Sequence, residues 1–223
     1  MAKKPSTLIN MLVALLVIAA VSGGVLGLVY GVTKDTIAQV DQKKNEAAIK
    51  AVLPLEDVTY KADTMQFNYE GVDLTFPCNL AYDANGNFKG AAVKTSEGGF
   101  GGKIDMMVGF LADGTIKGTS VLSHAETPGL GANMTGKFKD QFVDKNPNDF
   151  KLIVKKDGGD VDAITAATIT SRAFSKAVDK AYQAFMANKA QFMNNAPVEE
   201  AAPVMEEAPV EENNETEGGQ SNE

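Results

Sequence analysis

The most constraining feature of this sequence is a long apolar run near its N-terminus. No charged residue lies between Lys4 and Lys34, and residues 8–32 consist mainly of Leu, Val, Ile, Ala and Gly. As a helix this run would extend about 37 Å, enough to cross the hydrocarbon core of a bilayer with some tilt. Because no second run of this length occurs, we expect the chain to cross a membrane once.

Two interpretations of the run compete. A cleaved signal peptide needs a shorter apolar region and a small-residue cleavage site, which Ser22-Gly23-Gly24 offers. The apolar run continues past these residues, so we favour an uncleaved signal anchor over residues 8–32. Lys3 and Lys4 favour a cytoplasmic N-terminus, although lysines also follow the run. Everything after residue 33 would then lie outside the cytoplasm.

The net charge of −8 belongs to the end of the chain. Nine of the 29 acidic residues lie in residues 196–223, which contain no Lys or Arg, so 20 acidic residues face 21 basic ones in the rest. Low complexity, Pro and uncompensated Glu predict a disordered tail there. No basic patch with interleaved aromatic residues appears, so we expect no nucleic-acid partner. With one cysteine, Cys78, and one histidine, His124, neither an intrachain disulfide nor a metal site is expected.

The rest of the chain predicts a mixture of strands and helices. Residues 33–53 have a helical pattern that Pro54 ends, and we expect a stalk that continues the membrane helix. Asn85-Gly86 and Asp113-Gly114 are typical of turns between antiparallel strands. The expected strands cover residues 59–80, 88–95, 103–111, 115–123 and 152–154. We also expect a short helix over residues 138–142 and a long final helix from about residue 168 to residue 193.

Hydroxyl and small residues gather from Asp162 to Ser171, immediately before the last helical pattern. Such residues favour a helix start, with Thr168, Thr170 or Ser171 as the N-cap. A helix start also presents free backbone N–H groups and the positive end of the helix dipole, which suits an anion such as phosphate. On the local pattern alone both a simple cap and an anion site remain open.

Two further segments have the composition of binding loops. Residues 124–131 read His-Ala-Glu-Thr-Pro-Gly-Leu-Gly and follow directly after a predicted strand, the usual setting for a binding loop. Residues 98–102 read Gly-Gly-Phe-Gly-Gly, which matches no phosphate-binding loop because no Gly-Lys-Ser/Thr follows. This glycine cluster is either a flexible turn or a place where backbone approaches a flat ligand closely.

Two of these segments together resemble the FMN-binding domain family. Residues 165–170, Thr-Ala-Ala-Thr-Ile-Thr, preceded by Asp162, resemble its flavinylation motif, in which the last hydroxyl is the acceptor. Residues 124–131 resemble a loop of the same domain. Ala166 stands where Gly is commoner in the family. With one N-terminal anchor, the resemblance extends over residues 5 to 190 to the G subunits of Rnf ion-translocating electron transport complexes.

The resemblance implies that Thr170 carries FMN through a phosphoester, attached from FAD by a separate magnesium-dependent flavin transferase. The other motif residues would shape the turn, and Asp162 would orient the motif or help the transferase to recognise it. The loop residues would line the isoalloxazine ring. The residues so assigned to the FMN site are Asp162, Thr165, Ala167, Thr168 and Thr170 of the motif and Glu126, Thr127, Gly129 and Leu130 of the loop.

The resemblance also implies a place in the cell. The chain would be a single-pass subunit of a translocase in the cytoplasmic (inner) membrane, with no independent activity. The complex, with its other Rnf subunits, would couple electron transfer between ferredoxin and NAD to sodium or proton movement. We expect an α+β fold, with an extracytoplasmic FMN-binding domain of antiparallel meandering strands and flanking helices over residues 55–195. Before it we expect cytoplasmic residues 1–7, a transmembrane helix over residues 8–32 and a helical stalk over residues 33–54. The disordered acidic tail, residues 196–223, follows the domain.

Several alternatives remain open at this point. The C subunit of sodium-translocating NADH:quinone reductase shares the domain and the chemistry, but that family usually has extra segments between anchor and motif. A stand-alone flavinylated protein for extracellular electron transfer is a second alternative. An anchored binding module without enzymatic function, in which the Thr-rich stretch only caps a helix, is a third. A threonine hydrolase is disfavoured because no candidate base lies near Thr170 in the sequence.

Overall fold

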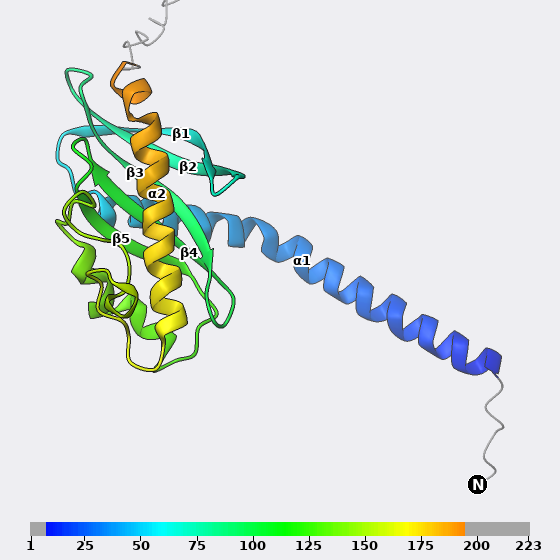
Figure 1. Cartoon of the computed structure of the whole chain (residues 1–223). Coiled ribbons are helices and arrows are strands. Elements are labelled where there is room, and N and C mark those ends of the chain that lie inside the picture. Colours follow the sequence, from blue (N-terminus) through cyan, green and yellow to red (C-terminus); the bar gives the residue numbers. More distant parts are fainter. Residues whose placement is uncertain (1–7, 195–223) are drawn as a thin grey trace, which may run out of the picture.

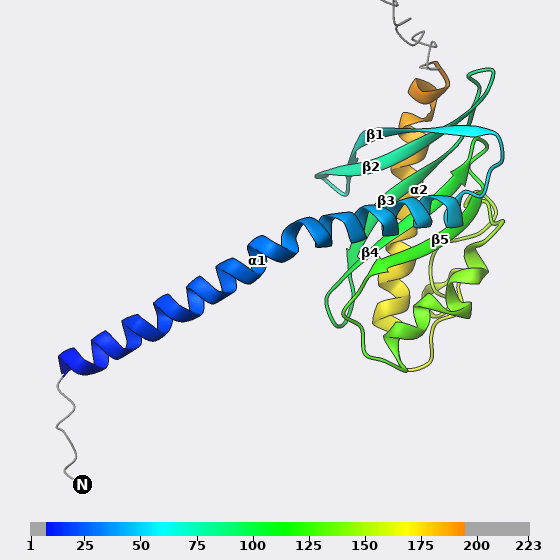
Figure 2. The same cartoon turned by 180° about the vertical axis from the view of Figure 1, so that it is seen from behind.

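The computed structural model describes residues 8–194, in which one long helix projects from a domain built on a single sheet (Figure 1 and Figure 2). The elements in chain order are a long helix, five strands, three short 3-10 helices and a second long helix. This arrangement confirms the predicted α+β class with antiparallel meandering strands. The predicted cytoplasmic residues 1–7 and the predicted acidic tail, residues 196–223, lie outside the described residues.

The first helix, α1 (Leu8–Val52), is continuous over 45 residues. Among the described residues it is the one helix long and apolar enough to span a membrane, and none of its apolar stretch is buried against the domain. Figure 2 shows it running away from the sheet. Its last turn is different, because Ala48, Val52 and the following Leu53 are buried. The stalk expected over residues 33–54 therefore ends inside the core.

Five strands form one antiparallel sheet in the order β1-β2-β3-β4-β5. Each strand pairs with the next one along the chain, as the turn signals predict. The strands are β1 (Val58–Tyr69), β2 (Val72–Asp83), β3 (Phe88–Gly98), β4 (Lys103–Leu111) and β5 (Ile116–Ser123).

The single strand predicted over residues 59–80 is wrong, because it is a hairpin of β1 and β2. The chain reverses at Glu70 and Gly71, which both have positive φ, 51° and 83°. Glu seldom adopts this left-handed conformation, so the residue pair carries no strong turn signal. The Asn-Gly and Asp-Gly turns were predicted correctly, with Gly86 and Gly114 at φ of 78° and 97°.

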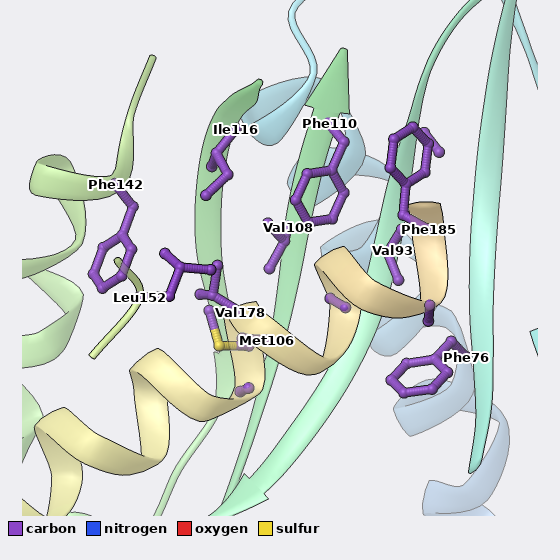
Figure 3. Close-up of a cluster of buried hydrophobic side chains, with 14 of the residues drawn as sticks. Phe76, Val93, Met106, Val108, Phe110, Ile116, Phe142, Leu152, Val178 and Phe185 are labelled. Carbon is purple, nitrogen blue, oxygen red and sulfur yellow. The ribbon is translucent and has the colours of Figure 1, made fainter. Parts of the chain in front are cut away.

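Both faces of the sheet are covered. The second long helix, α2 (Thr168–Asn194), packs its apolar stripe across one face, where Phe110 of β4 stacks on Phe185 with ring centroids 5.1 Å apart. Figure 3 shows this core, with Val178 and Phe185 of α2 facing side chains of β3 and β4. The end of α1 covers the opposite face, in a smaller cluster with Ala92 of β3 and Met107 of β4. Alternation along the strands supplies both clusters.

An irregular segment, residues 124–167, connects β5 to α2. It contains the 3-10 helices η1 (Gly131–Thr135), η2 (Lys137–Phe142) and η3 (Lys155–Asp157). The predicted helical patch over 138–142 is η2. The strand predicted over residues 152–154 is wrong, since only an isolated parallel bridge between Val154 and Val161 forms there. The apolar residues of that run, Leu152 and Val154, are buried in the core instead.

Candidate functional site

The loop after β5 and the start of α2 meet at one hydrogen bond. The Thr170 hydroxyl donates to Oε2 of Glu126 at 2.7 Å. Thr170 is 1% exposed and Glu126 5% exposed, so both polar groups lie in the protein interior. The fold therefore brings together the predicted acceptor of one motif and a carboxylate of the other.

Glycines enclose the Glu126 carboxylate on two sides. A Cβ atom at Gly99 would overlap Oε1 of Glu126, and a Cβ atom at Gly131 would overlap Oε2 and approach the Thr170 hydroxyl to 2.7 Å. A Cβ atom at Gly101 would likewise overlap the backbone carbonyl of Ala125. The backbone of residues 98–102 therefore approaches the protein's own loop closely. The predicted close approach of this backbone to a flat ligand stays a prediction.

Glu126 is a carboxylate in spite of its burial. Burial acts to raise the pKa of Glu126, but hydrogen bonds from the Thr170 hydroxyl and from the backbone N–H groups of Gly101 and Phe100 outweigh it and lower the pKa below its usual range. The Gly101 bond to Oε1 measures 3.0 Å. At neutral pH the group is therefore ionised and can only accept hydrogen bonds.

The start of α2 differs from the predicted cap. The helix begins at Thr168, and its first bond to preceding backbone joins the N–H of Ser171 to the carbonyl of Ala167 at 3.0 Å. The prediction of Thr168, Thr170 or Ser171 as N-cap is wrong, because these residues lie within the first turn. The Ser171 hydroxyl instead accepts from the N–H of Ile164 at 2.9 Å and donates to the Ala167 carbonyl.

This start leaves unpaired donors near the acceptor. Within residues 8–194 the backbone N–H groups of Thr168, Ile169 and Thr170 have no protein acceptor. Ala166, just before them, has a φ of 62°. A left-handed conformation costs about 1–2 kcal/mol for a residue with a Cβ, which explains why glycine suits this position.

A cavity of about 390 Å³ lies beside the Thr170–Glu126 pair. Its volume is within the usual range of small-molecule sites. The residues that line it are Phe100, Glu126, Thr127, Leu130, Gly131, Ala166, Ala167, Thr168, Ile169 and Thr170.

Of the predicted site residues, Glu126, Thr127, Leu130, Ala167, Thr168 and Thr170 line this cavity, whereas Gly129, Thr165 and Asp162 do not. Gly129 shapes the loop instead: it has a φ of 77°, and Leu130 N–H donates to the Thr127 carbonyl at 3.1 Å. Thr165 lies in the exposed turn before α2. Asp162 pairs with Lys155 at 2.8 Å and borders a larger hollow of about 610 Å³ that does not include Thr170.

Sequence reasoning missed two large apolar residues at the cavity. Phe100 is 71% exposed and Ile169 is 51% exposed, and with Leu130 they form an apolar rim. Phe100 could have been found from its place between two glycine pairs, an unusual setting for a core residue. Ile169 could have been found because it sits one residue before the predicted acceptor.

The single cysteine and the single histidine of the sequence are not part of the hydrogen-bonded pair of Thr170 and Glu126. Cys78 is 2% exposed in β2, and burial raises the pKa of its thiol to about 12, consistent with the role of a small apolar filler. The Nδ1 atom of His124 accepts a hydrogen bond from the N–H of Glu126 at 3.2 Å, so the exposed histidine helps to hold the loop.

Comparison with known proteins was decisive for the family. The family model of the FMN-binding domain matches residues 99–183, which contain both the loop and the start of α2. The G subunit of the ion-translocating oxidoreductase complex of Vibrio atlanticus is 35% identical over 182 residues, which cover 76% of this chain and 86% of that protein. The chain belongs to this G-subunit family.

Other members come from distant organisms. The G subunit of the Na⁺-translocating ferredoxin:NAD⁺ oxidoreductase complex of Acetobacterium woodii is 34% identical and covers 77% of this chain and 88% of that protein. The G subunit of the ion-translocating oxidoreductase complex of Methanosarcina acetivorans is also 34% identical, over 77% of this chain and 91% of that protein. The similarity therefore extends over most of each G subunit and beyond the FMN-binding domain.

The site of this chain has the chemistry that FMN requires. A phosphate needs hydrogen-bond donors, and the first N–H groups of α2 supply them. A flat ring needs apolar surface, and Phe100, Leu130 and Ile169 supply it at the rim of the cavity. The residues present thus fit the cofactor that the domain family implies.

Proposed function

We propose that this chain is the electron-transfer subunit of an Rnf-type complex and carries FMN bound covalently through a phosphoester to Thr170. The observation that carries the proposal is the position of the Thr170 hydroxyl, which lies at the start of α2 beside a cavity with an apolar rim. FMN, when bound, supplies electron transfer.

The residues around Thr170 have separate tasks in this proposal. The free N–H groups of Thr168 and Ile169 would stabilise the remaining phosphate charge, by about 0.3–1 kcal/mol for an anion at a helix start. Phe100, Leu130 and Ile169 would contact the ring and exclude water from one side of it. Thr127, together with the turn at Gly129, would hold the loop against the ring.

The membrane arrangement is part of the same proposal. Residues 8–32 would span the cytoplasmic (inner) membrane, and residues 33–54 would link the span to an FMN-binding domain of residues 55–195 on the periplasmic or outer face. The lysines at the N-terminus support this orientation. Its partners would be the other Rnf subunits and the flavin transferase, and the complex would couple electron flow between ferredoxin and NAD to sodium or proton movement. The name of the Acetobacterium woodii relative supports this reaction.

The test is production of the full chain together with a flavin transferase in cells that make both. We expect one FMN on the wild-type protein, seen as flavin fluorescence on a denaturing gel and as one added FMN phosphoryl group by intact mass. Thr170→Ala should lose all of it. Thr64→Ala, at an exposed threonine of β1 that does not line the cavity, is the control and should keep the label.

Peptide mapping completes the test, because it identifies the modified residue directly. Covalent flavin on a Thr170→Ala protein, or a label mapped to Thr165 or Thr168, would contradict the proposed attachment site. In cells that also make the other subunits of an Rnf complex, co-purification of the wild-type chain with an iron–sulfur subunit would support assembly into that complex, and purification alone after mild solubilisation would contradict it.

A further inference from the structure

We infer that Glu126 is the catalytic base of flavin attachment, the group that accepts the proton of the Thr170 hydroxyl. This inference rests on the proposed function, because it concerns how the acceptor is made reactive. A threonine hydroxyl is a weak nucleophile and is activated by an adjacent base. No base lies near Thr170 in the sequence, but the fold supplies one from 44 residues away.

The geometry of the pair is that of a nucleophile and its base. The distance of 2.7 Å between Thr170 Oγ1 and Glu126 Oε2 is within the 2.6–3.2 Å range expected of such pairs. The hydrogen bond is oriented with the hydroxyl as donor, since an ionised carboxylate has no proton to give. Within residues 8–194, Glu126 is the one titratable side chain that forms a hydrogen bond with the Thr170 hydroxyl.

The surroundings of Glu126 hold the carboxylate in one position. Oε1 accepts from the N–H of Gly101, which leaves Oε2 for Thr170. The absence of side chains at Gly99 and Gly131 provides the space for these two oxygens, one glycine for each. His124 of the same loop accepts the backbone N–H of Glu126 at its Nδ1 atom, 3.2 Å away, which helps to hold the loop backbone at this residue. A carboxylate that only filled space would not need glycines on both sides.

The attachment step balances without any redox partner. The Oγ1 atom of Thr170 forms a bond to the flavin-side phosphorus of FAD, and the bond from that phosphorus to the bridging oxygen breaks. AMP leaves with that oxygen. The hydroxyl proton passes to Oε2 of Glu126, so the carboxyl is neutral when the new phosphodiester charge appears beside it. Two like charges in this buried place would otherwise repel each other.

The experiment measures the rate of attachment on the purified full chain in detergent, with purified transferase, Mg²⁺ and FAD. Intact mass follows the labelled protein, and AMP release gives a second readout. Glu126→Gln should slow attachment by on the order of 10²–10⁴-fold, the usual contribution of general base catalysis. The wild-type rate should be flat from pH 6 to 8, whereas the residual rate of Glu126→Gln should rise with pH. Glu70→Gln, at an exposed carboxylate that does not line the cavity, is the control.

A second variant tests the position of the carboxylate without removing it. Gly131→Ala places a Cβ against Oε2 of Glu126 and should displace it from Thr170, so attachment should slow by at least tenfold. Thermal unfolding of each variant establishes that it is folded.

The outcomes separate the inference from the proposed function. If wild type is labelled on Thr170 and Glu126→Gln is labelled within tenfold of its rate, the base is elsewhere and the inference is overturned. A slowed Glu126→Gln whose pH profile parallels wild type would assign Glu126 to holding the loop and would equally overturn the proton role. If wild type takes no label, or Thr170→Ala keeps it, the proposed function itself fails.

Discussion

Glu126 and Thr170 illustrate what a sequence reveals at the scale of single residues. Each was a candidate from its own motif, because hydroxyls before a helix and polar residues after a strand have recognisable patterns. Their hydrogen bond could not be predicted, since it depends on how residues 124–167 fold back onto α2. The predicted N-cap of α2 was wrong for a related reason. Ser171 bonds to Ile164 and Ala167, and which hydroxyl does so depends on the turn geometry at Ala166.

The exposed apolar residues of the site were missed for a different reason. Phe100 and Ile169 have the composition of core residues, and a sequence does not reveal which apolar side chains remain exposed. Only the position of each chain segment around the cavity distinguishes them from core residues such as Phe110.

Asp179 on α2 gives a prediction of pH dependence. Burial raises the pKa of Asp179, although hydrogen bonds from Tyr69 and Gln183 act to lower it; nearby Glu70 raises it and Lys176 lowers it. A folded pKa above the unfolded value means that stability is greatest when the group is protonated, and is lost as pH rises through the folded pKa. Asp179→Asn, which stays neutral, should therefore raise Tm at pH 7 by about 1–3 °C.

The advantage of the variant should shrink as pH falls from 7 into the acid range, because wild-type Asp179 then also becomes protonated and its raised pKa makes this occur at a higher pH than for a free Asp. Thermal melts of both proteins across this pH range make the comparison, with Asp140→Asn on an exposed position as control. An advantage that stays constant with pH would show that the ionised carboxylate is not the cause.

At the scale of elements, turns with strong residue preferences were predictable and contacts between elements were not. Asn85-Gly86 and Asp113-Gly114 each mark the turn between two strands and so place one end of β2, β3, β4 and β5, since glycine takes positive φ without a Cβ clash. The run at 152–154 has strand composition, but no strand lies beside it to extend pairing past one bridge. The docking of α1 onto the sheet also has no local signal, because it depends on glycines in β4 and β5.

Those glycines give a prediction about how α1 is held. A Cβ at Gly109 of β4 would overlap the backbone carbonyl of Val52, and one at Gly118 of β5 would lie 2.9 Å from its Cα. Backbone cannot move aside as a flexible side chain can. Gly109→Ala should therefore lower the free energy of unfolding by about 1–3 kcal/mol, as overpacking in a core does.

Thermal or denaturant unfolding measures this effect. Gly98→Ala is the matched control at the end of β3, because a Cβ there meets nothing within 4 Å. Equal stability of the two variants would mean that the end of α1 is not packed against β4.

At the scale of the whole molecule, the folded unit begins before the boundary that the sequence suggests. Val52 and Leu53 are both 0% exposed, and the Tyr60 hydroxyl donates to the Leu53 carbonyl at 2.7 Å. The composition break at Pro54 marks the end of a helix and not the start of the domain. A sequence predicts such a break well, but it does not reveal which side of it is buried.

Two truncated chains test this boundary. A chain starting at residue 34 keeps the buried end of α1 and should retain the unfolding temperature of the domain. A chain starting at residue 56 loses two fully buried side chains, and should be less stable by about 3–6 kcal/mol from their burial alone. Circular dichroism melts compare the two, and equal melting temperatures would contradict the role of the α1 end.

The helix α1 is uninterrupted and its last turn packs on the sheet. Its number of residues therefore sets both the distance of the domain from the apolar segment and the rotation of the domain about the helix axis. Each residue added between positions 33 and 47 would turn the domain by about 100° around the helix axis and move it by about 1.5 Å. One added residue would therefore rotate the Thr170 cavity away from its original neighbours. Seven added residues would nearly restore the original orientation of the domain, with the domain about 10 Å further along the helix axis. The length of the helix therefore fixes both the distance and the orientation of the cofactor site relative to the apolar segment.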